Sequence, residues 1–391
     1  MAITRQLANG QKLTDWTDEV NDIANQYGVI NGSGMFSGQG TSLTSMVFDK
    51  EYNTISLIPQ SKRNGGPASK GNDRKVDTFT LAIPYFLHQD YITPQDIQGQ
   101  RQAGTPDSPE TLANVTAKKL EDMRLRADQT REFMKLQAVK AVTSDGEGNV
   151  IADMFSLFDV DYGITGNTGG TVSQLNWDFD LGNPAANING TIAAMRRSIA
   201  KNAKVGGRTG AVQCMVSTKF FDDLVNHPKI REAYLQFAET NANSNVIRGD
   251  LQKLEEWGVV DTFQYKGVLF YTYDAEFLVD DGAGGYNTRI AIGETTATSR
   301  DNHASYDATL TASVADGVAS VGYTVVEGMR GLYQGHFGPE NTLTGANSVG
   351  SEIMVRQYTD PKEKFHEMEL EMANLYHMTR PQMSVRVYSA T

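Results

Sequence analysis

The chain has 391 residues, of which 39% are hydrophobic and 21% charged, a composition typical of a globular protein rather than a disordered one. Its formal net charge of −12 excludes a general attraction to nucleic acid, so any such contact would be local. No window approaches the roughly 20 apolar residues of a membrane span, and the N-terminus lacks an apolar signal segment. The length predicts two or three lobes, and the 37 glycines favour turns and strands, so we expect an α+β protein.

The first 45 residues are polar. One short helix is predicted over 14–28, capped by Thr14 or Asp15 and followed by the glycine-rich stretch NGSGMFSGQGTS. This stretch lacks the GK[ST] signature of a phosphate loop. We therefore expect an extended arm that packs on another element.

A basic finger follows the arm. Two apolar segments, 55–59 and 76–83, flank a polar tip and predict a hairpin, which would be marginal in water without a partner. The tip has no aromatic residue to stack on bases, which disfavours nucleic acid and favours an acidic protein surface such as that of this chain. The basic residues predicted to make an intersubunit contact are Lys62, Arg63, Lys70, Arg74 and Lys75.

Prolines at 84, 94, 106 and 109 predict an extended run with turns after the finger. A long helix is then predicted over 109–143, with Ser108 as its N-cap and the sequence SDG closing it at 144–146. At 1.5 Å per residue it would be about 50 Å long, which suits an elongated molecule.

The later sequence predicts a second, α/β lobe. Helices are expected over 188–203 and 217–237 around a strand at 211–217, and two further strands are joined at QYKG. A hairpin is expected around Ala315, Asp316 and Gly317. At the C-terminus, KEKFHEMELEMANLYHMTRPQMSVRVY predicts a strand, a polar turn and a final strand that return to the lobe of the long helix.

The sequence shows little that could carry catalysis. It contains no HExxH, CxxC or GxSxG pattern, and the pairs Glu255/Glu256 and Asp280/Asp281 are typical of acidic surfaces. The single cysteine, Cys214, lies between apolar residues and is predicted to be a core thiol. We expect no catalytic residue, cofactor or metal. None of the histidines has a His or Cys at metal spacing; they are His88, His227, His303, His336, His366 and His377.

The order of arm, finger, long helix, α/β lobe and returning strand resembles that of tailed-bacteriophage major capsid proteins. Three stretches resemble the lambda-type branch, the phage major capsid protein E family. They are FTLAIPYFLHQDYITPQDIQGQRQAGT, REFMKLQAVKAV and DPKEKFHEMELEMANLYHMTRPQMSVRVY.

This resemblance implies the Hong-Kong-97-type fold, with five segments along the chain. They are an N-terminal arm (1–45), an E-loop hairpin with flanking strands (46–90), a P domain with its spine helix (91–185), an A domain (186–335, with 296–327 as a candidate insertion) and a return to the P domain (336–391).

The resemblance also implies partners. Copies of the chain would assemble as pentamers and hexamers into an icosahedral head, together with portal, scaffold and decoration proteins. Packaged double-stranded DNA would meet the inner face without sequence specificity, and no membrane would be contacted. Some relatives crosslink a lysine of the E-loop to a neighbour, but we predict no crosslink here.

Two alternatives stay open at this point. One is another self-assembling subunit, such as an encapsulin, tail-tube or surface-lattice protein; encapsulins share the capsid fold, so fold alone does not separate them. The other is an enzyme whose catalytic part is the lobe 185–335, for which the sequence offers no convergent polar residues.

Overall fold

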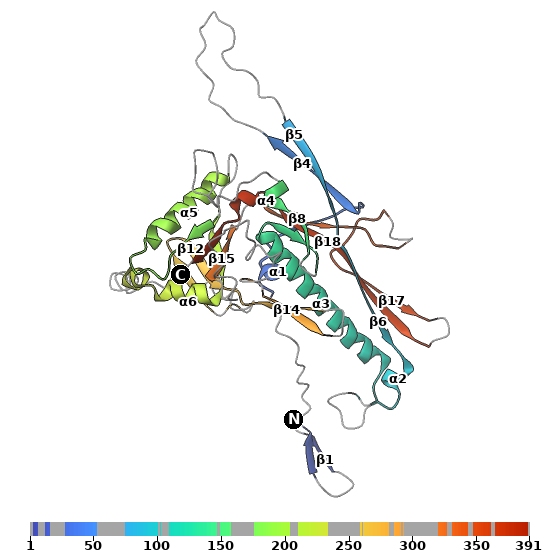
Figure 1. Cartoon of the computed structure of the whole chain (residues 1–391). Coiled ribbons are helices and arrows are strands. Elements are labelled where there is room, and N and C mark those ends of the chain that lie inside the picture. Colours follow the sequence, from blue (N-terminus) through green and yellow to red (C-terminus); the bar gives the residue numbers. More distant parts are fainter. Residues whose placement is uncertain are drawn as a thin grey trace, which may run out of the picture.

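The computed structural model describes residues 3–6, 12–15, 28–52, 75–100, 102, 109–146, 149–157, 176–203, 210–233, 259, 261–280, 285–290, 292, 320–326, 331–342, 347–360 and 364–389. These residues form an elongated α+β molecule. The long helix α3 lies beside one sheet, and a second sheet with its own helices lies on the other side (Figure 1). The predicted α+β class is confirmed.

Helix α3 (Leu112–Val139) is shorter than the predicted 109–143. The Thr111 hydroxyl, not Ser108, caps it by accepting a hydrogen bond from the Asn114 N–H at 3.3 Å. The Glu110 N–H donates to the Gln100 carbonyl, which ties this segment to the preceding chain instead of the helix. At its other end, Ala141 has a φ of 61°, so the chain turns away before the strand β7 (Val142–Ser144). The helix of 28 residues is about 42 Å long.

A five-stranded sheet packs along α3. It consists of β17 (Met354–Thr359), β18 (His366–Met378), β16 (Tyr333–Phe337) and β3 (Ser37–Gly40) in that order, with β6 (Tyr85–Ile92) also paired to β18. The first part of β18 pairs with β6 and β17, and its last part pairs with β16. Side chains alternate along β18, so one of its faces contacts α3 and the other faces away.

The second sheet has six strands. Their order is β11 (Thr262–Tyr265), β12 (Val268–Thr272), β10 (Val212–Val216), β15 (Ser320–Val326), β19 (Arg386–Ser389) and β9 (Asn176–Asp178). The helices α5 (Ile188–Asn202) and α6 (Thr218–Asn226) accompany it (Figure 1). Lys266 and Gly267 both have positive φ, so the predicted turn at QYKG is confirmed.

Cys214 lies on the inner strand β10 and is fully buried, so the predicted core thiol is confirmed. Burial raises the pKa of this thiol, which keeps it protonated and unreactive.

The C-terminal segment serves both sheets. Strand β18 packs on α3 as predicted, whereas β19 pairs with β15 in the six-stranded sheet. The expectation that the whole segment returns only to the lobe of the long helix is therefore wrong for β19. The polar turn between the two strands holds the short 3-10 helix η1 (Pro381–Met383).

The remaining elements are short. They are the paired strands β1 (Ile3–Gln6) and β2 (Lys12–Asp15), the hairpin β13 (Glu276–Asp280) and β14 (Tyr286–Ile290), β8 (Val150–Asp153) paired with β7, and the helices α1 (Val29–Ser33), α2 (Pro94–Ile97) and α4 (Met154–Leu157). Thr14 and Asp15 belong to β2, and the rest of the helix predicted over 14–28 lies almost wholly outside the described residues. The hairpin predicted at 315–317 also lies outside them.

The glycine-rich stretch after residue 28 is packed, in line with the expected docking of the arm. Helix α1, which the sequence did not predict, buries Val29 and Ile30, and β3 runs parallel to β16. One hydrophobic core joins α1, the C-terminal half of α3 and the six-stranded sheet. Because the end of α3 is enclosed by this core, even Glu132, Lys135 and Gln137 are buried there.

Candidate functional site

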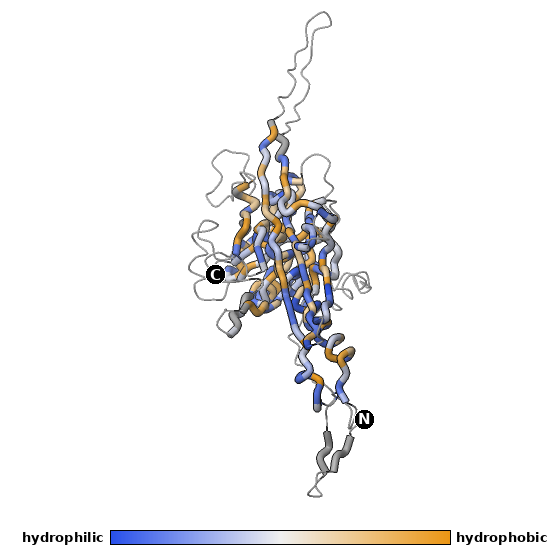
Figure 2. Tube along the Cα trace, turned by 90° about the vertical axis from the view of Figure 1, so that its right-hand side faces the viewer, coloured by the Kyte–Doolittle hydropathy of each residue, from blue (hydrophilic) through white to orange (hydrophobic). Residues whose placement is uncertain are grey.

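The predicted finger is an antiparallel hairpin of β4 (Ser45–Tyr52) and β5 (Lys75–Ala82). Its register runs from Ser45 opposite Ala82 to Tyr52 opposite Lys75, so residues 53–74 join the two arms. The second arm agrees with the prediction. The first paired arm is β4, upstream of the predicted segment 55–59, which lies outside the described residues. The hairpin projects from one end of the molecule (Figures 1 and 2).

The root of the hairpin is packed on the body. Phe48 stacks on Phe79 across the two arms with ring centroids 5.7 Å apart. The Phe48 ring also meets the edges or faces of His377 and His336 at centroid distances of 4.5 Å and 5.8 Å. Further along, Leu81 is buried. The root therefore has a fixed seat on the strands β16 and β18.

The hairpin leaves apolar side chains uncovered both at its root, beside Phe48, and near its outer end. Val47 is 55% exposed and Val76 is 40% exposed. Figure 2 shows hydrophobic residues interspersed with hydrophilic ones along both arms. Large apolar side chains that stay exposed in a projecting element are typical of a surface that a partner covers.

Four of the five predicted contact residues of the finger belong to the segment that joins its arms. Lys62, Arg63, Lys70 and Arg74 lie outside the described residues. Of Lys75 the structure describes the backbone, which begins β5 opposite Tyr52.

A second surface, which the sequence analysis missed, lies on the face of β18 that points away from α3. We call it the acidic face and define it by Glu367, Glu369 and Glu371, which alternate along the strand. Glu371 is only 4% exposed and accepts a hydrogen bond from the Asn341 N–H at 3.3 Å, so Glu367 and Glu369 are its accessible members. The opposite face of the same strand carries Met368 and Leu370, which are buried against α3. The alternation in HEMELEM was its signal in the sequence, but only the pairing of β18 shows what surrounds the glutamates.

Neutral side chains flank all three of these carboxylates. Gln89 on β6 donates a hydrogen bond from Nε2 to Glu369 Oε1 at 2.6 Å. A hydrogen bond to Glu367 is the main cause that raises the pKa of Tyr91, and burial followed by the charge of Glu371 raises that of Tyr85. Both shifts have the direction expected for a tyrosine beside a carboxylate.

The cation that lies opposite Glu369 on the neighbouring strand forms its ion pair with an acid outside this face. Arg356, opposite Glu369 on β17, forms an ion pair with Glu340 and donates to the Thr342 hydroxyl at 3.1 Å. The acidic face is therefore net negative among its described neighbours.

Exposed aromatic and aliphatic side chains border the acidic face. Tyr91 and Phe365 meet edge to face at 6.0 Å. Negative charge beside uncovered rings suits a partner segment that is cationic and partly apolar. The bordering side chains, each between 39% and 47% exposed, are Tyr85, Leu87, Tyr91, Tyr358 and Phe365.

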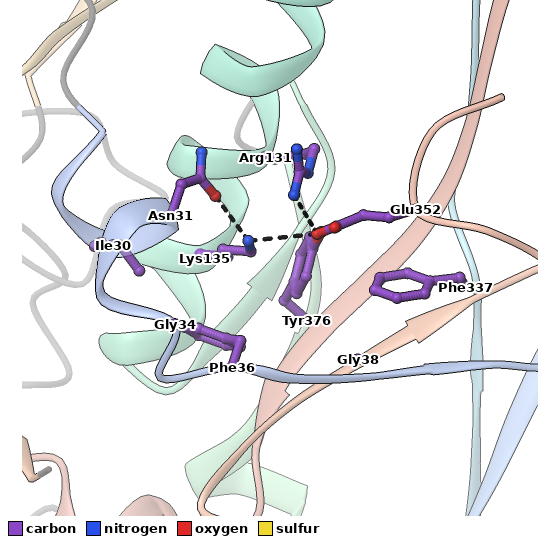
Figure 3. Close-up of a pocket in the computed structure, with 10 residues that line it drawn as sticks. All are labelled: Ile30, Asn31, Gly34, Phe36, Gly38, Arg131, Lys135, Phe337, Glu352 and Tyr376. Atoms are coloured by element: carbon purple, nitrogen blue, oxygen red, sulfur yellow. Dashed lines mark hydrogen bonds and ion pairs between the residues drawn. The ribbon is translucent and has the colours of Figure 1, made fainter. Parts of the chain in front are cut away.

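A buried ion network holds the arm against α3 (Figure 3). Glu132 accepts hydrogen bonds from the N–H groups of Ile30 at 2.8 Å and Asn31 at 2.7 Å, and from the Tyr273 hydroxyl at 2.9 Å. Burial raises the pKa of Glu132, and these donors oppose the rise. One carboxylate thus joins the arm, α3 and the segment after β12.

The same network lines a cavity of about 200 Å³. Lys135 donates to the Asn31 side chain at 2.7 Å and lies 3.4 Å from Glu352, which also pairs with Arg131 at 2.5 Å (Figure 3). The two cations of the cavity wall are thus engaged by the protein itself, which makes this a structural network. Its full lining is Ile30, Asn31, Gly34, Phe36, Gly38, Arg131, Lys135, Phe337, Glu352 and Tyr376.

The described residues were also compared with what a metal site and a membrane-spanning helix require. In this part of the chain, no three His, Cys, Asp or Glu side chains gather where they could hold a metal ion. None of its helices is long and apolar enough to cross a membrane.

The hairpin, the long helix beside a sheet and the returning C-terminal strand agree with the order of elements that the sequence predicts. The family model described as phage major capsid protein E matches residues 12–389. The chain belongs to this family.

Two curated relatives cover nearly the whole chain. The major capsid protein of Salmonella phage Felix O1 (isolate Felix O1-VT1) is 31% identical over 390 residues, 97% of this chain and 98% of the relative. That of Pseudomonas phage KPP10 is 26% identical over 386 residues, 97% of each chain.

Solved structures with a similar fold include the mature capsid of bacteriophage PhiM1, at 13% identity and a TM-score of 0.46, which covers 96% of this chain and 91% of that one. The cyanophage Pam1 capsid has 10% identity and a TM-score of 0.47, with 100% and 99% coverage. The family membership rests on the sequence matches.

Proposed function

We propose that this chain self-assembles as pentamers and hexamers into the icosahedral head that encloses the double-stranded DNA of a tailed bacteriophage. The observation that carries the proposal is the family match over residues 12–389. The uncovered apolar side chains of the projecting hairpin support it, because a neighbouring copy would cover them. The role is assembly rather than catalysis, in the host cytoplasm and then in the virion, with portal, scaffold and decoration proteins as further partners.

The finger would make the contact between neighbouring copies. Its joining segment, 53–74, contains Lys62, Arg63, Lys70 and Arg74 against the single acid Asp73, with Lys75 directly after it. The acidic face of β18 offers the opposite charge on another copy. Each subunit would give one finger and receive one, a heterologous contact that closes into rings.

The DNA would be held without sequence readout. With a net charge of −12, the subunit as a whole repels DNA, so contacts on the inner face would depend on local basic patches and counterions.

The first test is electron microscopy in negative stain of the chain expressed alone and with its neighbouring genes. Closed shells of uniform diameter are the expected result. Tubes would favour a tail protein, and a small species under all conditions would contradict the proposal and reopen the enzyme alternative.

A charge exchange tests the finger contact itself. The double change Glu367→Lys and Glu369→Lys should prevent closed shells, and adding Lys70→Glu and Arg74→Glu should restore them, since the pair of charges is then reversed. The control is Asp222→Lys, which reverses an exposed acid on α6 far along the chain from both surfaces. Normal shells from the Glu367/Glu369 variant would contradict the assigned contact while leaving the capsid function intact.

A further inference from the structure

Two histidines lie stacked beneath the root of the hairpin. His336 on β16 and His377 on β18 have ring centroids 5.1 Å apart and planes 17° from parallel. They are diagonal neighbours in the pairing of the two strands, since His336 lies opposite Leu375. His336 is 5% exposed and His377 is 1% exposed.

Within the described part of the chain, all four ring nitrogens of this pair lack a hydrogen-bond partner. Buried polar atoms are nearly always hydrogen-bonded, because leaving water without a new partner costs free energy. Phenylalanine or leucine would fill such a site without that cost. An unpartnered pair of imidazoles at this position therefore calls for a role other than packing.

Both imidazole rings favour the neutral form in this buried position beneath the hairpin. Burial lowers the pKa of His336, and burial together with the neighbouring His336 lowers that of His377 to about 3. An imidazolium at this position would lie beside a second imidazole and away from bulk solvent.

No described carboxylate forms a hydrogen bond with either ring, and Asp77, which lies on the same face of the hairpin as Phe48, is exposed. On β18, the nearest acid on the same face is Glu371, toward the other end of the strand. On the hairpin, the Asp49 carboxylate accepts from the Thr78 hydroxyl on the exposed side. From α3, the cations Lys135 and Lys140 lie over the rings of Tyr376 and Tyr323 instead, and β3 presents the neutral Gln39 opposite His336.

The lid of this seat is a residue of the hairpin. The Phe48 ring meets His377 at 4.5 Å, at 67° between the planes, and meets His336 at 5.8 Å. Phe48 is itself coupled to the second arm of the hairpin through Phe79. Water can reach the histidine pair most directly if this root lifts.

We propose that His336 and His377 form a proton switch that unseats the root of the finger when the pH falls. While both rings are neutral, Phe48 stays on them and the hairpin keeps its direction. Once a ring takes up a proton, the charged form needs water, and lifting Phe48 supplies it. The switch belongs to the single subunit, so it does not depend on the proposed shell.

The direction and the size of the pH effect on the packing of the hairpin root follow from the difference in the pKa of His377 between the packed and the released state. A hydrated histidine titrates near pH 6.5 and seated His377 near 3, so seating is fully stabilised above about 6.5 and weakens as the pH falls toward 3. At pH 4.5 the seating equilibrium should be weaker than at pH 7 by about a hundredfold for His377 alone.

Hydrogen exchange of the unassembled subunit between pH 7 and 4.5 tests the switch. After correction for intrinsic exchange rates, peptides over β4 and β5 should lose protection as the pH falls, earlier than those over β10. The double change His336→Phe and His377→Phe keeps two stacked rings without a titrating group and should remove this dependence. A hairpin whose protection is independent of pH in the unaltered chain would overturn the proposal.

His88→Gln is the matched control. This histidine is half-buried on β6, opposite Leu370, and its pKa is also lowered, by burial and then by Arg126. It lies on the helix side of the sheet and not under the hairpin. The pH dependence of the hairpin should persist in this variant, and its loss would show that the titration of His88, rather than of the pair, releases the root.

A second variant covers the case in which the double change does not fold. Phe48→Ala opens the seat to water, so the pKa of His377, followed by the NMR shift of its ring proton, should rise toward the ordinary value. An unchanged low pKa in this variant would contradict the assignment of Phe48 as the lid.

Discussion

At the scale of single residues, the buried carboxylate of Glu132 decides where the arm sits. Three donors from two other segments point at its oxygens, at distances between 2.7 and 2.9 Å. Glu132→Gln turns an amide NH₂ toward at least one of these donors, and the unsatisfied groups should lower the free energy of unfolding by about 3 kcal/mol. Urea unfolding measures this loss, and limited proteolysis near residue 28 should report a loosened arm.

The exposed Glu121 on the same helix gives the control, because Glu121→Gln changes the same charge without a buried partner. Equal losses for the two variants would mean that charge on α3, and not the three hydrogen bonds, stabilises the arm.

Glu352 should make a contribution to the free energy of unfolding that depends on pH. Burial alone would raise its pKa, but the hydrogen bond and charge of Arg131 and the charge of Lys135 outweigh burial and lower it. Because folding lowers this pKa, the stabilisation is complete above the ordinary pKa of a glutamate, about 4.3, and is lost as the pH falls through the folded value.

Glu352→Gln should therefore lower the free energy of unfolding at pH 7 by about 2 kcal/mol, less than for a fully buried ion pair because the side chain is 33% exposed. The difference from the unaltered chain should narrow as the pH falls below about 4.3 in urea unfolding. A difference that stays constant over this range would assign the loss to packing.

At the scale of elements, the hairpin is the part whose removal should separate folding from assembly. Deleting residues 60–74 removes only part of the joining segment and leaves the packed root around Phe48 and Phe79 in place. The subunit should stay folded and soluble, with an unchanged circular dichroism spectrum, yet form no stable closed shells by electron microscopy. Normal shells from this deletion would contradict the role given to the finger.

The elements also show how far the sequence could predict the fold. A run without proline or glycine predicted α3, and alternation predicted β18, since both signals are local. The ends of α3 were wrong because the Glu110 hydrogen bond to Gln100 and the positive φ of Ala141 depend on the surrounding chain. Strand β4 was missed because its partner β5 lies beyond the finger.

The candidate sites likewise divide into one that the local sequence predicts and others that depend on strand pairing. The basic residues of the finger are visible as a local excess of charge, whereas the acidic face exists only through the register of β6 and β17 on β18. Likewise, His336 and His377 are distant in sequence and meet only through the pairing of β16 with β18. The spacing of residues in HEMELEM indicates only that the glutamates share one face of β18, and nothing in the spacing predicts the histidine pair.

At the scale of the whole molecule, one continuous core links the two sheets, and the C-terminal half of α3 runs through it. Leu136 is fully buried in this core. Leu136→Ala should lower the free energy of unfolding by about 2–5 kcal/mol, the range for a large apolar side chain that leaves a cavity. Because the core is shared, the loss should appear in both sheets rather than in one.

Hydrogen exchange in increasing urea can follow β10 and β18 separately. Both should lose protection at one urea concentration, and Leu136→Ala should shift that concentration equally for the two strands. Leu112→Ala, at the 46% exposed start of the same helix, should shift neither measurably. If β18 opened well before β10, the two lobes would be separate folding units, and the finger, seated on β16 and β18, could then change its direction without any change in the other lobe.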